Sequence, residues 1–201
     1  MIRNIIFDLG QVLVSFLPDY IVRRCAPGLP EEDVQLLVEK VVRDPEWVKL
    51  DSGKATEEEL IPVFCRRLPE RLHSGIAALL RGWADCLLPI EEMQALAQSL
   101  GGAGYRRYLL SNVSHRFWDI KEQIPPLDGY LISADERLIK PDPAIYHRLF
   151  ERFSLTPGEC FFIDDREENI EAARACGMDG FVFEGDVAAL KAALHQAGVD
   201  C

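Results

Sequence analysis

Hydrophobic and polar positions divide this 201-residue chain into three regions of different character. Residues 5–7 are apolar and run directly into Asp8, a pattern typical of a short buried strand that ends in a carboxylate. Residues 17–88 contain no strand-like run, and their apolar positions recur at helical spacing, as in residues 34–42. From residue 89 onward, apolar runs of strand length alternate with helical stretches. The pattern therefore predicts one strand, a block of helices, and an α/β region.

The α/β region can be divided further by its caps, prolines and glycines. Asp142 before Pro143 predicts the start of a helix, because aspartate caps a helix and proline suits its first position. Gly177 predicts the end of another helix. The predicted strands are 107–111, 130–132, 160–163 and 180–183, and the predicted helices are 89–100, 115–121, 143–153, 166–176 and 187–197. Strands that alternate with helices indicate a doubly wound parallel sheet, a Rossmann-like α/β fold.

The helical block interrupts this fold after its first strand. We therefore expect an α/β core made of residues 1–14 and 89–201, and an inserted α-helical cap made of residues 15–88. Thr56 and Glu59 form the pattern of a capping box and predict that one helix of the insertion begins there. The insertion is placed to cover the carboxyl edge of the sheet, which is where ligands of open α/β folds bind.

Composition and charge restrict the possible partners. Hydrophobic residues make up 48% and charged residues 27% of the chain, as in a globular protein. The net charge of −11 argues against nucleic acid, which needs a basic surface. No apolar run approaches the roughly 20 residues that cross a bilayer, and Asp8 interrupts the first apolar segment, so we expect neither a membrane span nor a signal peptide. The six cysteines lack the spacing of a zinc site and are expected to be reduced, which favours a cytoplasmic protein; we also expect a monomer.

Four short polar signatures follow predicted strands or lie in a loop near one. They are Asp8 after the first strand, Ser111 and Asn112 at the end of the second, Lys140 in a turn, and the pair 164–165 after the strand at 160–163. Because the carboxyl ends of parallel strands lie along one edge of the sheet, we expect these side chains to converge. Together they offer a carboxylate nucleophile, a hydroxyl with backbone amides, a fixed cation, and an acidic pair whose oxygen ligands suit Mg²⁺ better than zinc.

Each signature taken alone has a simpler interpretation. A lone Asp8, or the acidic pair 164–165, is compatible with capping of a helix N-terminus, which favours negative charge. Ser111 with its neighbour is compatible with an ordinary turn, and the Lys140 turn with a helix start. Their joint order along the chain is what favours a catalytic site. The three tryptophans are expected to be packing residues, with the alternative that Trp47 faces a substrate.

This set of residues, in this order and spacing, resembles the haloacid dehalogenase-like (HAD) hydrolase superfamily. The resemblance covers nearly the whole chain, from the strand that carries the nucleophile, through a helical cap inserted directly after it, to the three later motifs. The chain is most similar to the branch that contains alpha-D-glucose-1-phosphate phosphatase. In that branch the first motif likewise reads Asp-Leu-Gly, as in residues 8–10, and the fourth has two adjacent aspartates followed by an asparagine, as in residues 164–169.

The resemblance implies a Mg²⁺-dependent phosphatase that acts on a small phosphate monoester. Asp8 would attack phosphorus and form an aspartyl-phosphate intermediate. Lys140 would neutralise charge on Asp8 and on the phosphoryl group. Mg²⁺ would be held by Asp8, the backbone carbonyl of Gly10, and Asp165.

The same resemblance assigns the remaining motif residues to binding and support. The Ser111 hydroxyl and the Asn112 backbone amide would hold phosphate oxygens. Asp164 and Asn169 would orient the metal ligand, the lysine or metal-bound water. The implied partner is a small phosphorylated metabolite, such as a sugar phosphate.

Gly10 departs from the superfamily pattern, in which most phosphatases have an aspartate two residues after the nucleophile. That aspartate protonates the leaving group and later activates water, which is typically worth about 10²–10⁴-fold in rate, or roughly 3–5 kcal/mol of barrier. Glycine keeps the carbonyl ligand but supplies no proton. The substrate is therefore expected to have a good leaving group, as in a sugar 1-phosphate or, better still, an acyl phosphate or an aryl-like ester.

Two alternatives remain open at this stage. Asp51, in a turn of the insertion, is a candidate acid supplied by the cap. Alternatively, the protein is a slow or silent phosphatase that binds a phosphometabolite or a partner protein. Dehalogenase chemistry is disfavoured, because it needs no metal and leaves the acidic pair 164–165 without a use.

Overall fold

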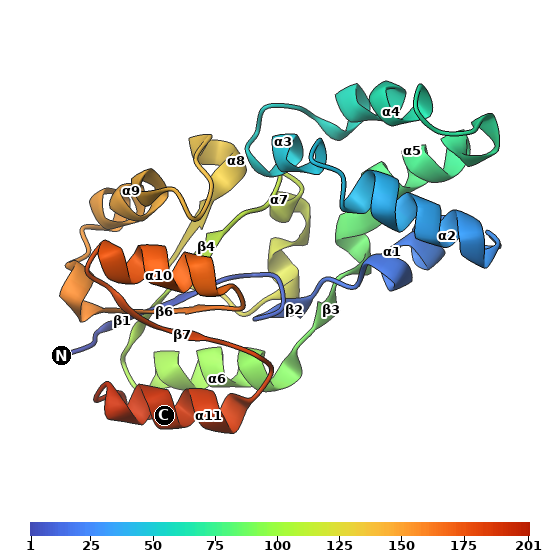
Figure 1. Ribbon diagram of the computed structural model, residues 1–201. Helices are drawn as coiled ribbons and strands as arrows, with labels where there is room; N and C mark the ends of the chain where they lie inside the picture. The colour runs from blue at the N-terminus through green and yellow to red at the C-terminus, as the bar shows by residue number, and fades with distance from the viewer.

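The computed structural model describes all 201 residues and has a five-stranded parallel sheet at the centre of its α/β region (Figure 1). The strand order is β5-β4-β1-β6-β7, so the first strand of the chain lies in the middle of the sheet. The strands are β1 (Asn4–Phe7), β4 (Arg106–Ser111), β5 (Gly129–Ile132), β6 (Cys160–Asp164) and β7 (Asp179–Val182). The predicted doubly wound parallel fold is confirmed.

Helices cover both faces of this sheet. Figure 1 shows α6 and α11 on one face and α9 and α10 on the other. Side chains alternate along β1, so that Ile5 and Phe7 join a cluster of 42 buried apolar residues on one side, whereas Ile6 joins a second cluster of 14 on the other. The four helices are α6 (Glu91–Gly102), α9 (Pro143–Phe153), α10 (Glu167–Ala175) and α11 (Val187–Gln196).

A separate group of helices lies between β2 (Val14–Ser15) and β3 (Leu88–Pro89), which pair with each other as a short antiparallel ribbon. In Figure 1 this group stands beside the carboxyl end of the sheet. Its members are α1 (Pro18–Cys25), α2 (Glu31–Leu37), a π-helical turn (Val38–Val42), α3 (Trp47–Asp51), α4 (Glu57–Cys65), α5 (His73–Gly82) and two 3-10 turns (Glu70–Leu72 and Trp83–Cys86). The larger apolar cluster continues from the sheet into these helices.

The capping box predicted for α4 is present. The Thr56 hydroxyl accepts a hydrogen bond from the Glu59 backbone N–H at 3.3 Å, and the Glu59 carboxylate accepts one from the Thr56 N–H at 2.8 Å. These two bonds satisfy backbone donors that the first turn of a helix leaves free. The start of α9 at Pro143, capped by the Asp142 carboxylate, is also as predicted.

The helix predicted from residue 89 begins two residues later, at Glu91. Pro89 pairs with Val14 in the β2–β3 ribbon, so the chain that returns from the helical group stays extended at this point. The two-residue strands of the ribbon carry no periodic pattern, and the sequence interpretation therefore missed them.

The helix predicted at 115–121 is also shorter in the structure. The α-helical part, α7, covers Phe117–Ile120 and is followed by a 3-10 turn, Lys121–Gln123. Ile124 is extended, because the proline that follows it disfavours helical backbone. Two further short elements, α8 (Ser133–Glu136) and a 3-10 turn (Pro157–Glu159), complete the fold. None of the helices has both the length and the apolar character needed to cross a membrane.

Candidate active site

The predicted site residues come from the carboxyl ends of three adjacent strands and one loop. Phe7, the last residue of β1, pairs with Leu109 of β4 on one side and with Ile163 of β6 on the other. Asp8 therefore lies level with the ends of both neighbouring strands. The structure brings all four sequence signatures to this edge of the sheet, and the following contacts join them.

Lys140 is the charged centre of the site. Its Nζ lies 2.9 Å from Asp8 Oδ1 and 2.6 Å from Asp164 Oδ2, and it donates a hydrogen bond to the Leu110 carbonyl at 3.0 Å. The side chain is only 3% exposed. Burial by itself lowers the pKa of Lys140, but the carboxylates of Asp8 and Asp164 outweigh burial and raise it above the ordinary value. Lys140 is therefore a permanent cation between two acids.

Asp8 is buried at the same point, with 8% of its surface exposed. Burial raises the pKa of the Asp8 carboxyl to about 6, with the Lys140 charge opposing this and the Asp164 charge adding to it. Asp8 Oδ1 meets Lys140 as a close ion pair, although the alignment is not that of a hydrogen bond.

Asp164 is fully used by its neighbours. Its Oδ2 contacts Lys140, and its Oδ1 accepts hydrogen bonds from the Asn169 side-chain amide and the Arg166 backbone N–H, both at 2.9 Å. Asn169 is held in turn by its carbonyl, which accepts a hydrogen bond from the Tyr146 hydroxyl at 2.9 Å. The contacts give Asp164 and Asn169 a positioning function toward Lys140.

Asn112 has its side chain turned toward the backbone of Lys140. The Asn112 amide nitrogen donates to the Lys140 carbonyl at 2.9 Å, and the Lys140 N–H donates to the Asn112 amide oxygen at 2.8 Å. Sequence reasoning assigned only the backbone amide of Asn112 and missed this contact. Ser111, at the end of β4, is buried and lines the cavity described below.

The acidic residues fit a hard divalent cation. Asp8, Asp164 and Asp165 offer carboxylate oxygens that all lie within 4.8 Å of one another. Because both oxygens of Asp164 are already engaged, Asp8 and Asp165 are the two carboxylates available to a metal ion. Burial and the neighbouring Asp164 charge raise the pKa of Asp165. All-oxygen ligands of this kind suit Mg²⁺.

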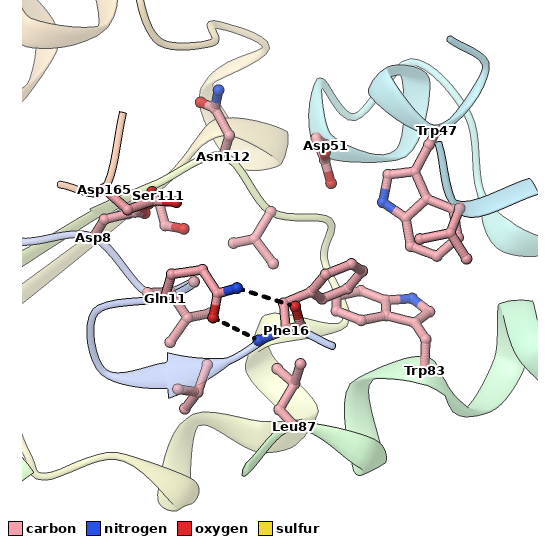
Figure 2. Close-up of a pocket in the computed structure, with 15 residues that line it drawn as sticks. Asp8, Gln11, Phe16, Trp47, Asp51, Trp83, Leu87, Ser111, Asn112 and Asp165 are labelled. Atoms are coloured by element: carbon pink, nitrogen blue, oxygen red, sulfur yellow. Dashed lines mark hydrogen bonds between the residues drawn. The ribbon is translucent and has the colours of Figure 1, made fainter. Parts of the chain in front are cut away.

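A cavity of about 260 Å³ opens from this charged edge toward the helical group (Figure 2). Asp8, Ser111 and Asp165 lie at one end of it, and Gly10 also lines it. The opposite end is formed by aromatic and aliphatic side chains from the ribbon and the helical group: Val14, Phe16, Val42, Trp47, Trp83 and Leu87. The cavity therefore has one charged end and one apolar end.

Several lining residues were not found from the sequence as site residues. Phe16 and Trp83 have the apolar character of core residues, and no sequence signal separates a cavity wall from a core. Gln11 is a further lining residue that the sequence did not reveal. Its amide exchanges two hydrogen bonds of 3.3 Å with the backbone of Phe16 (Figure 2). Trp47 is buried and also lines the cavity, and the sequence alternative that it faces a substrate stays a prediction. Trp118 packs edge to face on Phe117 and Tyr130 as a packing residue would, but it is 42% exposed, with its indole N–H 3.2 Å from Asp135.

Asp51 closes the cavity from the side of the helical group. It is the last residue of α3, and Figure 2 shows its carboxylate directed into the cavity, across from Asp8. Its backbone carbonyl accepts a hydrogen bond from the Ser133 hydroxyl, which ties this turn to the α/β region. Burial raises the pKa of the Asp51 carboxyl to about 8, and the charges of Asp8 and Glu57 add to the effect.

Comparison with known proteins gives one family and several phosphatases. A family model described as haloacid dehalogenase-like hydrolase matches residues 2–177. A sesquiterpene phosphatase of Aspergillus oryzae is 28% identical over 182 residues, which are 87% of this chain and 86% of the relative. A D-ribitol-5-phosphate phosphatase of Bacteroides thetaiotaomicron is 26% identical over 195 residues, which are 90% of this chain and 91% of the relative.

A solved structure shares the same overall fold. The crystal structure of a HAD family enzyme of Bacteroides thetaiotaomicron, in complex with magnesium and inorganic phosphate, matches with a TM-score of 0.72 at 23% identity. The match covers 94% of this chain and 99% of the other chain. At that identity the likeness describes the fold alone.

Proposed function

Because the chain belongs to the haloacid dehalogenase-like hydrolase family and is a hydrolase, we propose that it is a Mg²⁺-dependent phosphatase that hydrolyses a small phosphate monoester. The observation that carries this proposal is the buried group of Asp8, Lys140 and Asp164, with Asp165 beside it, at the mouth of a cavity. This group would supply a carboxylate nucleophile, a fixed cation and an acidic metal ligand around one point. Two relatives whose names describe phosphatases support it.

In the proposed reaction, Asp8 attacks phosphorus and forms an aspartyl-phosphate, which water then hydrolyses. Lys140 compensates charge on Asp8 and on the phosphoryl oxygens, because it is buried and its cationic form is stabilised by two acids. The Ser111 hydroxyl and the Asn112 backbone amide hold phosphate oxygens. Each of these groups is positioned before substrate arrives, which lowers the cost of reorganisation during the reaction.

We propose that Mg²⁺ is held by Asp8, Asp165 and the backbone carbonyl of Gly10. When bound, it would polarise the phosphoryl group and offset the repulsion between two anions. Asp164 and Asn169 support this site indirectly, since their hydrogen bonds fix Lys140 and leave Asp165 free.

The finer features of the proposal rest on the sequence patterns and on the relatives. Gly10 and the resemblance to the glucose-1-phosphate phosphatase branch make a sugar phosphate, such as a sugar 1-phosphate, one candidate substrate. A relative named for D-ribitol 5-phosphate supports a polyol phosphate, and one named for sesquiterpenes supports a hydrocarbon phosphate. We also propose that residues 15–88 act as the cap over a core of 1–14 and 89–201, and that the protein is a cytoplasmic monomer.

A phosphate-release assay tests the proposed function. The purified protein is expected to hydrolyse members of a broad panel of phosphate monoesters with Mg²⁺ and to lose this activity on Asp8→Asn substitution. The exposed Asp200, which lines no cavity described above, provides a matched Asp200→Asn control. If no ester shows Mg²⁺-dependent turnover above the Asp8→Asn variant, the alternative is favoured, namely a HAD-fold protein that binds a phosphometabolite or a protein partner.

A further inference from the structure

The apolar end of the cavity is a preformed aromatic wall. The ring centroids of Phe16, Trp47 and Trp83 lie 6.3, 6.0 and 5.7 Å apart in the three pairings, and all three pairs meet edge to face. Edge-to-face contacts fix the rings relative to one another. Phe16 is held further by its backbone, whose carbonyl accepts a hydrogen bond from the Gln11 amide nitrogen and whose N–H donates one to the Gln11 amide oxygen. The wall therefore exists before any substrate binds.

Two polar side chains of the cavity are committed to the backbone of the protein itself. The Gln11 amide is used by the Phe16 backbone, and the Asn112 side chain by the Lys140 backbone. On the helical side of the cavity, the Asp51 carboxyl and the indole N–H of Trp83 have no hydrogen-bond partner, and the rest of that wall is apolar. A sugar carries several hydroxyl groups, and each one that is buried without a partner is costly.

From these features we propose that the cavity selects phosphate monoesters whose organic group is apolar, an aryl or branched hydrocarbon group, in preference to sugar phosphates. This inference rests on the proposed phosphatase function. The phosphoryl group lies at the Asp8 end, and the organic group packs against Phe16, Trp47 and Trp83. Burial of the apolar group against the wall supplies binding energy that a hydroxylated group cannot obtain there.

A matched pair of substrates tests this selection. n-Hexyl phosphate and glucose 6-phosphate are both six-carbon esters of a primary alcohol, and they differ in the hydroxyl groups and the ring that the sugar carries. We expect kcat/KM to be at least about tenfold higher for n-hexyl phosphate, the size of effect that small changes in apolar contact produce. A preference for glucose 6-phosphate in the wild-type protein would overturn the proposal.

Variants of the wall separate selection from chemistry. Trp47→Ala is expected to raise KM for n-hexyl phosphate about tenfold and to raise KM for acetyl phosphate, whose two-carbon organic part reaches less of the wall, by clearly less. Trp118→Ala, which removes an exposed tryptophan outside the cavity, is the control. Trp47→Phe keeps the packing and should give a smaller change, in case the alanine variant is unstable. Equal losses on both substrates would count against the wall, whereas absence of Mg²⁺-dependent turnover of every phosphate monoester in the panel by the wild type would instead contradict the proposed function.

A second inference concerns the proton that Gly10 does not supply. Asp51 projects into the cavity from α3, shares this cavity with Asp8 and Gly10, and makes no side-chain hydrogen bond. Its position is fixed by the bond from Ser133 to its backbone. Its raised pKa, about 8, leaves it protonated at neutral pH.

We infer that Asp51 is the catalytic acid of the proposed phosphatase, supplied by the helical group in place of the usual residue at position 10. When Asp8 bonds to phosphorus and the ester P–O bond breaks, the leaving oxygen takes the proton of Asp51 and departs as an alcohol. In the second step, water bonds to phosphorus, the P–O bond to Asp8 breaks, and the Asp51 carboxylate accepts the proton of that water. Both steps leave the atoms and charges balanced.

The dependence on leaving group tests this assignment. Asp51→Asn is expected to lower kcat for n-hexyl phosphate by about 10²-fold or more, and kcat for p-nitrophenyl phosphate by less than about tenfold, because nitrophenolate leaves without a proton. Asp85→Asn, an exposed aspartate of the same helical group, is the control. Equal losses on both substrates, or no loss on n-hexyl phosphate, would refute the inference.

A rescue experiment adds a readout that a structural defect would not produce. A Cβ at Gly10 meets no atom within 4 Å, so an aspartate side chain can be accommodated there. In the Asp51→Asn background, Gly10→Asp is expected to restore part of the turnover of n-hexyl phosphate. Absence of rescue in a folded double variant would count against Asp51 as the acid. If the wild-type protein did not hydrolyse p-nitrophenyl phosphate at all, that result would instead contradict the proposed function.

Discussion

Asn112 and Lys140 hold each other through two reciprocal hydrogen bonds, in which each residue donates one and accepts one. The two bonds connect the end of β4 to the loop before α9 and fix the backbone from which the Lys140 ammonium reaches Asp8. The position of the cation in the site thus depends on an amide side chain that contacts neither Asp8 nor Asp164.

Substitution of Asn112 is expected to reduce both stability and activity. Asn112→Ala removes both hydrogen bonds and should lower the free energy of unfolding by about 1–3 kcal/mol. It should also lower kcat about tenfold, because Lys140 loses its fixed position. Asn112→Asp keeps an acceptor oxygen but loses the donor. Its free energy of unfolding and its kcat should therefore lie between those of the wild type and of Asn112→Ala. Urea unfolding and phosphate release measure these effects, and unchanged kcat in Asn112→Ala would contradict the positioning function.

Magnesium is expected to stabilise the protein through Asp8 and Asp165. At a Mg²⁺ concentration one hundred times Kd, a ligand that binds only the folded state adds about 2.7 kcal/mol to the free energy of unfolding. Asp165→Asn should weaken this stabilisation strongly, since it removes the carboxylate with no other partner in the acidic group. The Tm measured with increasing Mg²⁺ shows this directly, with Asp85→Asn as the control. A full Mg²⁺ response in Asp165→Asn would place the metal elsewhere.

Asp51→Asn is expected to stabilise the protein at high pH. Burial, with the nearby Asp8 and Glu57 charges, raises the pKa of Asp51 from 3.8 to about 8. The folded state holds this proton more tightly than the unfolded chain, so the contribution of the group to stability is lost as pH rises from about 4 to about 8.

At pH 9 the Asp51→Asn variant should therefore exceed the wild type by about 1–3 kcal/mol in free energy of unfolding, a range reduced from the full shift because the side chain keeps some solvent contact. The difference should disappear near pH 4. Urea denaturation at the two pH values makes the measurement. A difference of the same size at both would show that the substitution acts through packing and not through the proton.

Gly53→Ala is expected to disturb the docking of α3 on the α/β region. A Cβ at Gly53 would overlap the Ala134 carbonyl, and its φ of +63° disfavours any side chain. Gly28 also has a positive φ, +83°, but no atom lies close to where its Cβ would be. Gly28→Ala therefore measures the cost of the backbone conformation alone, without a steric overlap. We expect Gly53→Ala to cost about 1–3 kcal/mol more than Gly28→Ala and to lower kcat as well. Equal losses of unfolding free energy in the two variants would mean that the backbone at Ala134 moves away from the new methyl group at little cost.

The sheet and the acids at its edge could be predicted from the sequence because both depend on local pattern. An apolar run that ends at Asp8, and another that ends at residues 164–165, is enough to place these acids at one edge once the strands are parallel. Lys140 could be placed near them, because its turn precedes a clearly capped helix.

The rest depended on contacts between distant residues. The side chain of Asn112 could not be oriented, since a strand-end asparagine has several partners within reach. Phe16 and Trp83 could not be separated from core residues, because burial against a cavity and burial in a core need the same apolar side chains. The exposure of Trp118 could not be predicted for a related reason, because an aromatic residue in a one-turn helix such as α7 is compatible with either a buried or an exposed face.

The β2–β3 ribbon has a consequence for how this protein can change. Both passages of the chain between the sheet and the helical group occur in this one ribbon, at Val14–Ser15 and Leu88–Pro89. The aromatic wall and Asp51 lie inside the segment between these two strands, whereas Asp8, Lys140 and Asp165 lie outside it. Substrate preference and proton donation are therefore encoded in one stretch of the gene, and the groups that surround the phosphoryl site in the stretches on either side. Evolution, or an engineer, can replace the segment between the two strands as a unit, provided that the new segment again supplies an acid.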